Sequence, residues 1–349
     1  MEKLEITYLF ITNSATGGGA ERAVNIVVRT LQEINPSIGL LTLNSGPADL
    51  IRIKNHEFNI GREWRSGLFQ TLQAGFRFYK KVKLLNPKVV IANCELPELM
   101  IALFVINRKI ICVEHVRMPW KNRKFLGFVI RFLLLLKGVT WVTVSPYLRP
   151  WCQFVRKTMV IRNPVLAESL NKDGADYSSG STRINRLIYV GRLTAEQKRP
   201  EWLLQICASL SLPAKFIGAG DERKRLEDLA LELQVKCEFR GQSSNPWESW
   251  EQGDLLIVPS AWEGDGLVVV EAILLEIPIL LSDIPEFRFF GLDDKFYCKN
   301  PSEFSKKIIQ YRSDYSSLIV PNEIRENLKA IRDPNVIASQ WNELLEKFK

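Results

Sequence analysis

Two carboxylates, Glu263 and Glu271, are separated by seven residues and lie on either side of a turn, Gly264-Asp265-Gly266. Glu271 lies in an apolar run, where a carboxylate is costly to bury unless it meets a donor or lines a cavity. It also follows closely the start of a predicted helix, where free backbone N–H groups favour negative charge. A nucleotide would satisfy both features, with hydroxyls for Glu271 and phosphates for the helix start. The alternative is a structural glutamate bonded to a neighbouring loop.

The residues around this turn predict a strand and a helix. The run Asp254 to Pro259 is short and apolar, which is typical of a buried strand. The run Leu267 to Leu275 is apolar on every face except at Glu271, which predicts a helix buried all round. A strand therefore ends, the chain turns, and a helix begins, with one carboxylate on each side of the turn.

Two cations follow another predicted strand, Arg186 to Val190. Arg192 and Lys198 at a strand end suit a diphosphate, because arginine binds it bidentately and lysine binds it as a point charge. The alternative is two solvated surface cations. A further strand, Ala214 to Ile217, leads into a glycine turn that starts at Gly218.

The N-terminal part has the same alternation of strands and helices. A strand over 4–11 is followed by Gly17-Gly18-Gly19 and by apolar residues at helical spacing from Ala20 to Leu31, which predicts a doubly wound α/β unit. The glycines fit neither G-x-G-x-x-G nor a P-loop, so dinucleotide and ATP binding lose support and a flexible loop remains the alternative. Two later strands end at Asn93 and at Glu114-His115, on the side where open sheets bind ligands.

Three motifs together resemble the retaining GT-B glycosyltransferases of the GT4 type, also called glycosyltransferase group 1. They are Gly18-Gly19-Ala20-Glu21-Arg22, the Gly191-Arg192-Leu193 turn with Lys198, and Glu263-x7-Glu271 with Ser260 and Gly264. The resemblance covers nearly the whole chain and implies two Rossmann-like, doubly wound α/β domains that face a cleft. The expected ranges are an acceptor-side domain over 1–167, a nucleotide-sugar domain over 183–333 after a polar linker, and a C-terminal helix over 334–349 that packs back on the first domain.

The resemblance also implies roles for individual residues. Arg192 and Lys198 would neutralise the departing diphosphate, Glu263 and His115 would position the donor sugar, and Glu271 would bind the ribose. The remaining contacts with the donor would come from the two glycine-rich turns, the exit of the strand over 237–242 and the helix start: Gly18, Gly19, Gly218, Gly241, Gln242, Gly266 and Leu267.

The implied reaction transfers a hexosyl-type group from a nucleotide-sugar, most commonly UDP-linked, to an acceptor hydroxyl with retention. Asp265 departs from the apolar residue often found at its position, and we expect it to point away or to cap the helix. No Asp-x-Asp motif follows a strand, so we expect neither a catalytic metal nor a cofactor besides the donor substrate. A nucleotide-sugar epimerase and a non-catalytic binding protein are the alternatives.

The charge and the cysteines restrict partners and compartment. A net charge of +8 and a pI near 9.1 favour an acidic partner. Nucleic acid is not expected, since no basic face interleaved with aromatics lies outside 118–137. Six scattered cysteines suggest free thiols in a reducing, cytoplasmic compartment. Neither a signal peptide nor an apolar run of about 18 residues is evident, so neither secretion nor a membrane span is expected.

Residues 118–137 support two interpretations. An aromatic stripe that includes Phe125, Phe128 and Phe132, with basic residues that include Arg131, predicts a helix on an anionic membrane surface. The apolar second half of the segment instead suits a buried helix. The first interpretation predicts an enzyme on the inner face of the cytoplasmic membrane that builds a lipid-linked glycan, such as a lipopolysaccharide or capsule precursor.

Overall fold

In the computed structural model, the chain forms two compact α/β units, and each is described by itself. The structure describes residues 5–14, 18–44, 57–63, 67–117, 119–148, 158–170, 183–243 and 245–348. Residues 171–182, most of the polar linker expected between 167 and 183, therefore lie outside the described residues. The first unit combines Met1–Val165 with Ile331–Lys349, and the second is Leu166–Ala330. The second unit is thus inserted into the sequence of the first.

The first unit is built on a parallel sheet with strand order β3-β2-β1-β4-β5-β6-β7. The strands are buried on both faces over β1, β2 and β4, as a parallel sheet between helices requires. Their bounds are β1 (Tyr8–Thr12), β2 (Ile38–Asn44), β3 (Glu57–Arg62), β4 (Val89–Asn93), β5 (Lys109–Glu114), β6 (Thr140–Thr143) and β7 (Thr158–Val160).

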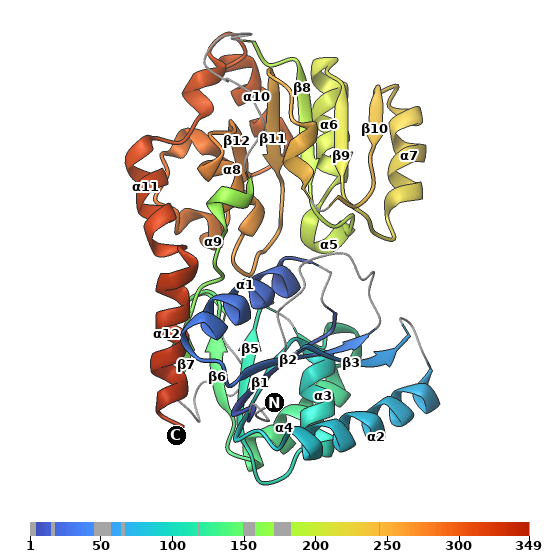
Figure 1. Ribbon diagram of the computed structural model, residues 1–349. Coiled ribbons are helices and arrows are strands. Elements are labelled where there is room, and N and C mark those ends of the chain that lie inside the picture. Colours follow the sequence, from blue (N-terminus) through green and yellow to red (C-terminus); the bar gives the residue numbers. More distant parts are fainter. Residues whose placement is uncertain are drawn as a thin grey trace. The chain divides into compact units, whose positions relative to one another are not determined.

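Helices cover both faces of this sheet (Figure 1). One face carries α2, α3 and α4, which bury Phe78, Ile101 and Leu134 against it. The other face carries α1 and α12, which bury Val28 and Trp341. The helices are α1 (Gly19–Ile34), α2 (Leu68–Leu85), α3 (Glu95–Phe104), α4 (Lys124–Leu136) after the 3-10 turn η1 (Lys121–Arg123), and α12 (Pro334–Glu346).

Helix α12 belongs to the core of the first unit although it comes last in the chain. Trp341 packs edge-on against Phe10 of β1, with ring centroids 5.3 Å apart. Ile337, Leu344 and Leu345 are buried in the same cluster. The helix begins after Asp333, whose carboxylate accepts from the backbone N–H groups of the first turn.

The second unit repeats this arrangement with strand order β10-β9-β8-β11-β12-β13. Its strands are β8 (Arg186–Val190), β9 (Ala214–Ile217), β10 (Cys237–Phe239), β11 (Asp254–Val258), β12 (Ile279–Ser282) and β13 (Tyr297–Cys298). Every pairing between neighbours is parallel. The order reverses between β8 and β11, as it does between β1 and β4 in the first unit, which is the doubly wound pattern.

Helices of the second unit pack on its sheet in the same way. Leu203, Leu226 and Phe304, from α6, α7 and α10, share one hydrophobic core with β8, β9 and β11. The helices and 3-10 turns are η2 (Ala167–Leu170), α5 (Ala195–Lys198), α6 (Glu201–Leu210), α7 (Arg223–Glu232), η3 (Pro246–Ser249), α8 (Leu267–Leu274), α9 (Pro285–Arg288), η4 (Asp294–Phe296), α10 (Pro301–Gln310), η5 (Tyr315–Leu318) and α11 (Asn322–Ile331). The predicted fold class, two Rossmann-like α/β domains, is confirmed.

Helix α4 corrects the buried-helix interpretation of residues 118–137 and the role of one residue in the membrane-surface interpretation. Ile130 and Leu134 are buried, yet Phe132 and Leu136 are 48% and 71% exposed, so the second half of the helix is not buried all round. Arg131 does not add positive charge to the surface, because it is buried and paired with two carboxylates. Met118 lies outside the described residues.

Candidate active site

In the second unit, two segments with predicted site residues follow β8 and β11, the strands between which the strand order reverses. Arg192 follows β8, and the turn from Ser260 to Gly266 follows β11. These strands are parallel neighbours, with Leu187 beside Leu255. Because the carboxyl ends of parallel strands meet at one edge, both segments lie where open α/β sheets bind ligands.

Lys198 and Glu263 form the charged centre of this edge. The ammonium of Lys198 donates to Glu263 Oε1 at 2.6 Å, and the hydroxyl of Ser260 donates to the same oxygen at 2.6 Å. The Glu263 side chain is 8% exposed and that of Lys198 is 17% exposed. The sequence placed the two residues 65 positions apart, and the fold brings one cation and one carboxylate into direct contact.

Gln197 joins the strand-end cations to the turn after β11, and sequence reasoning missed it. Its backbone carbonyl accepts from Ala261 N at 2.7 Å, and its side-chain Nε2 donates to Trp262 O at 3.4 Å. Its Oε1 accepts from Arg192 Nη2 at 3.1 Å. Arg192 is exposed, and this amide is one hydrogen-bond partner of its guanidinium. The sequence shows Gln197 only as a polar neighbour of Lys198. Its partners Ala261 and Trp262 lie far away in sequence, so their contact with Gln197 could not be predicted.

The glycine turns at this edge pack backbone against backbone. Gly218 N donates to Gly241 O at 2.7 Å, and Gly191 N donates to Ile217 O at 3.0 Å. A Cβ on Gly218, at φ +150°, would lie 1.8 Å from Gly191 O. Only glycine therefore fits there, so its first role is close packing of the loops. Gln242 lies beside this contact and is exposed.

Glu271 is buried on α8, and its carboxylate is directed by an aromatic residue that sequence analysis did not assign. The indole Nε1 of Trp247, in η3, donates to Glu271 Oε2 at 3.0 Å. The helix begins after Gly266, which is its N-cap at φ +66°. The N-cap residue is therefore a glycine, which has no side chain, and Asp265 lies one position before it. Within this first turn, the backbone N–H groups of Val269 and Val270 donate to Gly266 O at 2.8 and 3.1 Å.

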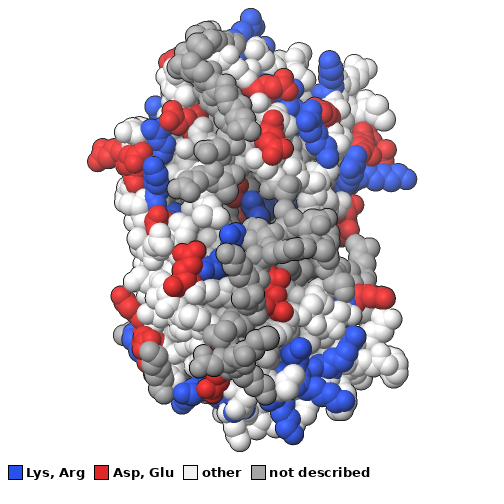
Figure 2. All heavy atoms as spheres, in the orientation of Figure 1, with Lys and Arg blue, Asp and Glu red and all other residues white. Residues whose placement is uncertain are grey.

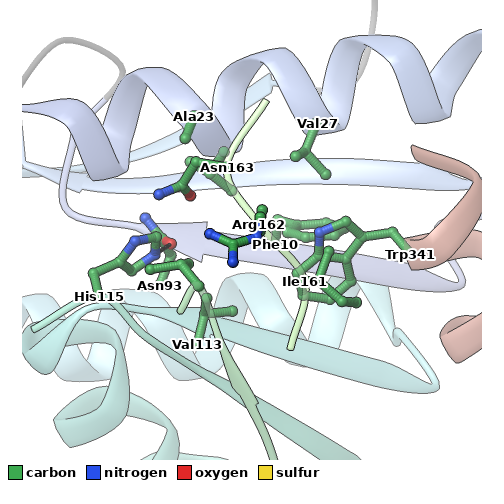
Figure 3. Close-up of a pocket in the computed structure, with 12 residues that line it drawn as sticks. Phe10, Ala23, Val27, Asn93, Val113, His115, Ile161, Arg162, Asn163 and Trp341 are labelled. Carbon is green, nitrogen blue, oxygen red and sulfur yellow. Dashed lines mark hydrogen bonds between the residues drawn. The ribbon is translucent and has the colours of Figure 1, made fainter. Parts of the chain in front are cut away.

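In the first unit, one predicted site residue, His115, lines a pocket. His115 lines this pocket with Asn93, Arg162 and Asn163, and Phe10 and Trp341 form its apolar wall (Figure 3). His115 Nε2 lies 2.5 Å from Asn93 Oδ1, and burial lowers the pKa of His115 to about 4. Gly18 is the N-cap of α1, and Gly19 is the first residue of that helix.

A buried cluster of charges lies next to His115 in the sequence and on the opposite side of β5 from the pocket. Arg131 Nη2 donates to Glu98 Oε1 at 3.1 Å and to Glu114 Oε2 at 2.7 Å. The indole of Trp120 donates to Glu98 at 2.8 Å. Burial raises the pKa of Glu114 to about 8, against the attraction of Arg131. The cluster therefore joins α3, β5 and α4 through one shared guanidinium.

Comparison with known proteins relates the second unit to a family. Residues 179–330 match the family described as "Glycosyl transferases group 1". The O-antigen biosynthesis glycosyltransferase WclY of Escherichia coli is 30% identical over 142 residues, which are 37% of this chain and 40% of that protein. A Campylobacter jejuni N-acetylgalactosaminyltransferase, named for a diphospho-undecaprenol-linked glycan, is 28% identical over 131 residues, 36% and 35% of the two chains. The chain thus spans well under half the length of these curated relatives.

The whole chain resembles solved structures in fold. Anabaena HepE, solved in complex with UDP and glucose, has a TM-score of 0.78 at 16% identity, with 98% of this chain and 99% of that chain covered. A lipopolysaccharide outer core galactosyltransferase, WaaB, has a TM-score of 0.63 at 17% identity, with 98% and 99% covered. The two Rossmann-like domains thus have the GT-B fold, and the second carries the group 1 glycosyltransferase match.

Proposed function

We propose that this protein is a glycosyltransferase that moves a sugar from a nucleotide-sugar to an acceptor hydroxyl. The observation that supports it most is the convergence of Arg192, Lys198 and Glu263 at the strand reversal of the second unit. A buried carboxylate near the start of a helix, Glu271 on α8, lies in the same unit. This set offers cations for a diphosphate and a carboxylate for ribose hydroxyls, in the unit that matches glycosyltransferases.

The chemistry that we propose is electrostatic. As the bond to the sugar breaks, negative charge develops on the departing diphosphate, and Arg192 and Lys198 stabilise it. Lys198 is paired with Glu263 before the donor binds, so the lysine would exchange a carboxylate for a phosphate oxygen. Glu263 would then turn toward the hydroxyls of the donor sugar, while Trp247 keeps Glu271 oriented. In line with the GT4 resemblance, we propose retention, no catalytic metal, and the leaving phosphate as the group that takes the acceptor proton.

Thermal unfolding with UDP, GDP, CMP and NAD tests the donor class. A ligand at 100 times its Kd stabilises the folded state by about 2.7 kcal/mol. We expect one nucleoside diphosphate, UDP, to raise the Tm, with the same shift in EDTA. Stabilisation by NAD alone, or a shift that EDTA abolishes, would contradict the proposed donor or its metal independence. Glu271→Gln should reduce the UDP shift, and the exposed Glu232→Gln on α7 is the matched control.

We also propose that the acceptor is a lipid-linked glycan at an anionic membrane surface. Among the described residues, every helix is too short or too polar to span a bilayer. Exposed aromatic side chains on α4 and α2, such as Phe128 and Phe76, lie among exposed cations such as Lys124 and Lys80. Figure 2 shows Lys and Arg side chains along the lower edge of the first unit, where Figure 1 places α2 and α4. Aromatic and basic side chains together favour an anionic lipid surface.

Liposome binding tests this surface. Reversing Lys121, Arg123 and Lys124 to glutamate should weaken binding to anionic vesicles on the order of 100-fold, since each cation near such a surface contributes about 1 kcal/mol. Salt should weaken binding of the unaltered protein. Three exposed lysines of the second unit, reversed together, form the control: Lys224, Lys236 and Lys306. Equal partitioning to neutral and anionic vesicles would argue against the surface.

A further inference from the structure

Asn93 connects His115 to the glycine-rich start of α1. Asn93 ends β4 and is 1% exposed. Its Nδ2 donates to Thr12 Oγ1 at the end of β1, at 3.1 Å, and to Ala20 O in the first turn of α1, at 3.4 Å. Its Oδ1 lies 2.5 Å from His115 Nε2. One amide therefore contacts the ends of two strands, the start of a helix and the imidazole.

These contacts fix the orientation of the amide. A backbone carbonyl such as Ala20 O only accepts hydrogen bonds, so the side facing it has to be the NH2 group. The opposite side, Oδ1, then faces His115, and an amide oxygen also only accepts. His115 Nε2 must therefore carry a hydrogen.

The imidazole holds this one hydrogen only. Burial disfavours the charged imidazolium and so lowers the pKa of His115 to about 4. The ring is therefore neutral at neutral pH. Arg162 lines the same pocket, so an imidazolium would add a second positive charge beside its guanidinium. Nδ1 thus keeps its lone pair, and within the described part of the chain it has no hydrogen-bond partner.

We infer that Asn93 is a positioning residue that holds His115 in the Nε2–H tautomer, so that Nδ1 serves as an acceptor for a sugar hydroxyl. The ligand group at His115 is then a donor, which a hydroxyl is and an ionised carboxylate or phosphate oxygen is not. This inference rests on the proposed function for the identity of the ligand. The tautomer itself rests on the contacts of Asn93 alone.

Nitrogen-15 NMR of the imidazoles tests the tautomer without any substrate. The chain has two histidines, His56 and His115, and the His56→Gln variant leaves the signals of His115 alone. At neutral pH we expect a protonated Nε2 and a bare Nδ1. A proton on Nδ1, or on both nitrogens, would overturn the inference. Because no donor is present, this result stands even if the protein transfers no sugar.

Asn93→Leu tests whether the asparagine sets the tautomer. Loss of the amide oxygen should leave His115 as a mixture of both neutral tautomers and raise the KM for the donor about tenfold, with a smaller change in kcat. Thr12→Val is the matched control, since it removes one partner of Asn93 but keeps the contacts with Ala20 and His115. An unchanged His115 spectrum in Asn93→Leu would show that Asn93 does not position it. An altered spectrum with no donor turnover in any variant would instead contradict the proposed function.

Discussion

Lys198→Ala is expected to lower kcat/KM for sugar transfer by about 100- to 1,000-fold, the loss that follows removal of one preorganised donor to a developing negative charge. Lys198 donates to Glu263 at 2.6 Å at the strand reversal, so the structure already directs it into the site. The effect should fall mainly on kcat, because the charge to be stabilised develops in the transition state. Steady-state kinetics with the donor identified by thermal unfolding would measure it.

Two further variants make this result specific. Lys306→Ala removes an exposed lysine on α10 and should leave kcat/KM within about twofold of wild type. Arg192→Ala should resemble Lys198→Ala, since both cations are proposed to meet the same diphosphate. If Lys198→Ala kept kcat/KM within a few-fold of wild type, Lys198 would not be the group that stabilises the leaving group.

Arg131→Met is expected to lower the free energy of unfolding of the first unit by about 3–5 kcal/mol, since removing one partner of a buried ion pair leaves an uncompensated charge. Here the loss leaves two buried carboxyl groups, Glu98 and Glu114, without their shared cation, so each must take up a proton or stay charged without a partner. Methionine keeps most of the aliphatic volume, so the change is mainly one of charge. Urea denaturation would measure it through the midpoint.

A second substitution separates charge from packing. Glu114→Gln in the Arg131→Met background should recover part of the loss, because one buried carboxylate is then removed. Arg123→Met, at the exposed start of the same helix, should change stability by no more than about 0.5 kcal/mol. A loss below about 1 kcal/mol in Arg131→Met would mean that the cluster contributes little to stability.

The fold could be predicted because its signals are local. Apolar runs, glycine turns and the helical spacing from Ala20 to Leu31 lie within short stretches, and they predict alternating strands and helices. The placement of Glu263 and Glu271 after one strand, in one turn and on one helix is likewise a local feature of the sequence. These local patterns suffice for the fold class.

Other contacts could not be predicted, because each joins residues that are distant in sequence. Trp247 meets Glu271 and Gln197 meets Trp262 only after β8 and β11 pair. The sequence around Arg131 predicts a surface cation, because its two carboxylate partners come from α3 and β5 and helical spacing does not indicate them. Strand β3 and helix α10 were not predicted at all. The sequence therefore predicts which chemical groups the site contains, but it does not predict how these groups are oriented relative to one another.

The insertion of the second unit into the first has a consequence for biosynthesis. The second unit is one continuous segment, whereas the first needs α12 to complete the core that contains Phe10 and Trp341. The segment of the second unit is therefore synthesised in full before α12 is made. The apolar face that α12 covers cannot be buried before that helix is synthesised, and exposed apolar surface of this kind makes partly folded chains prone to aggregation.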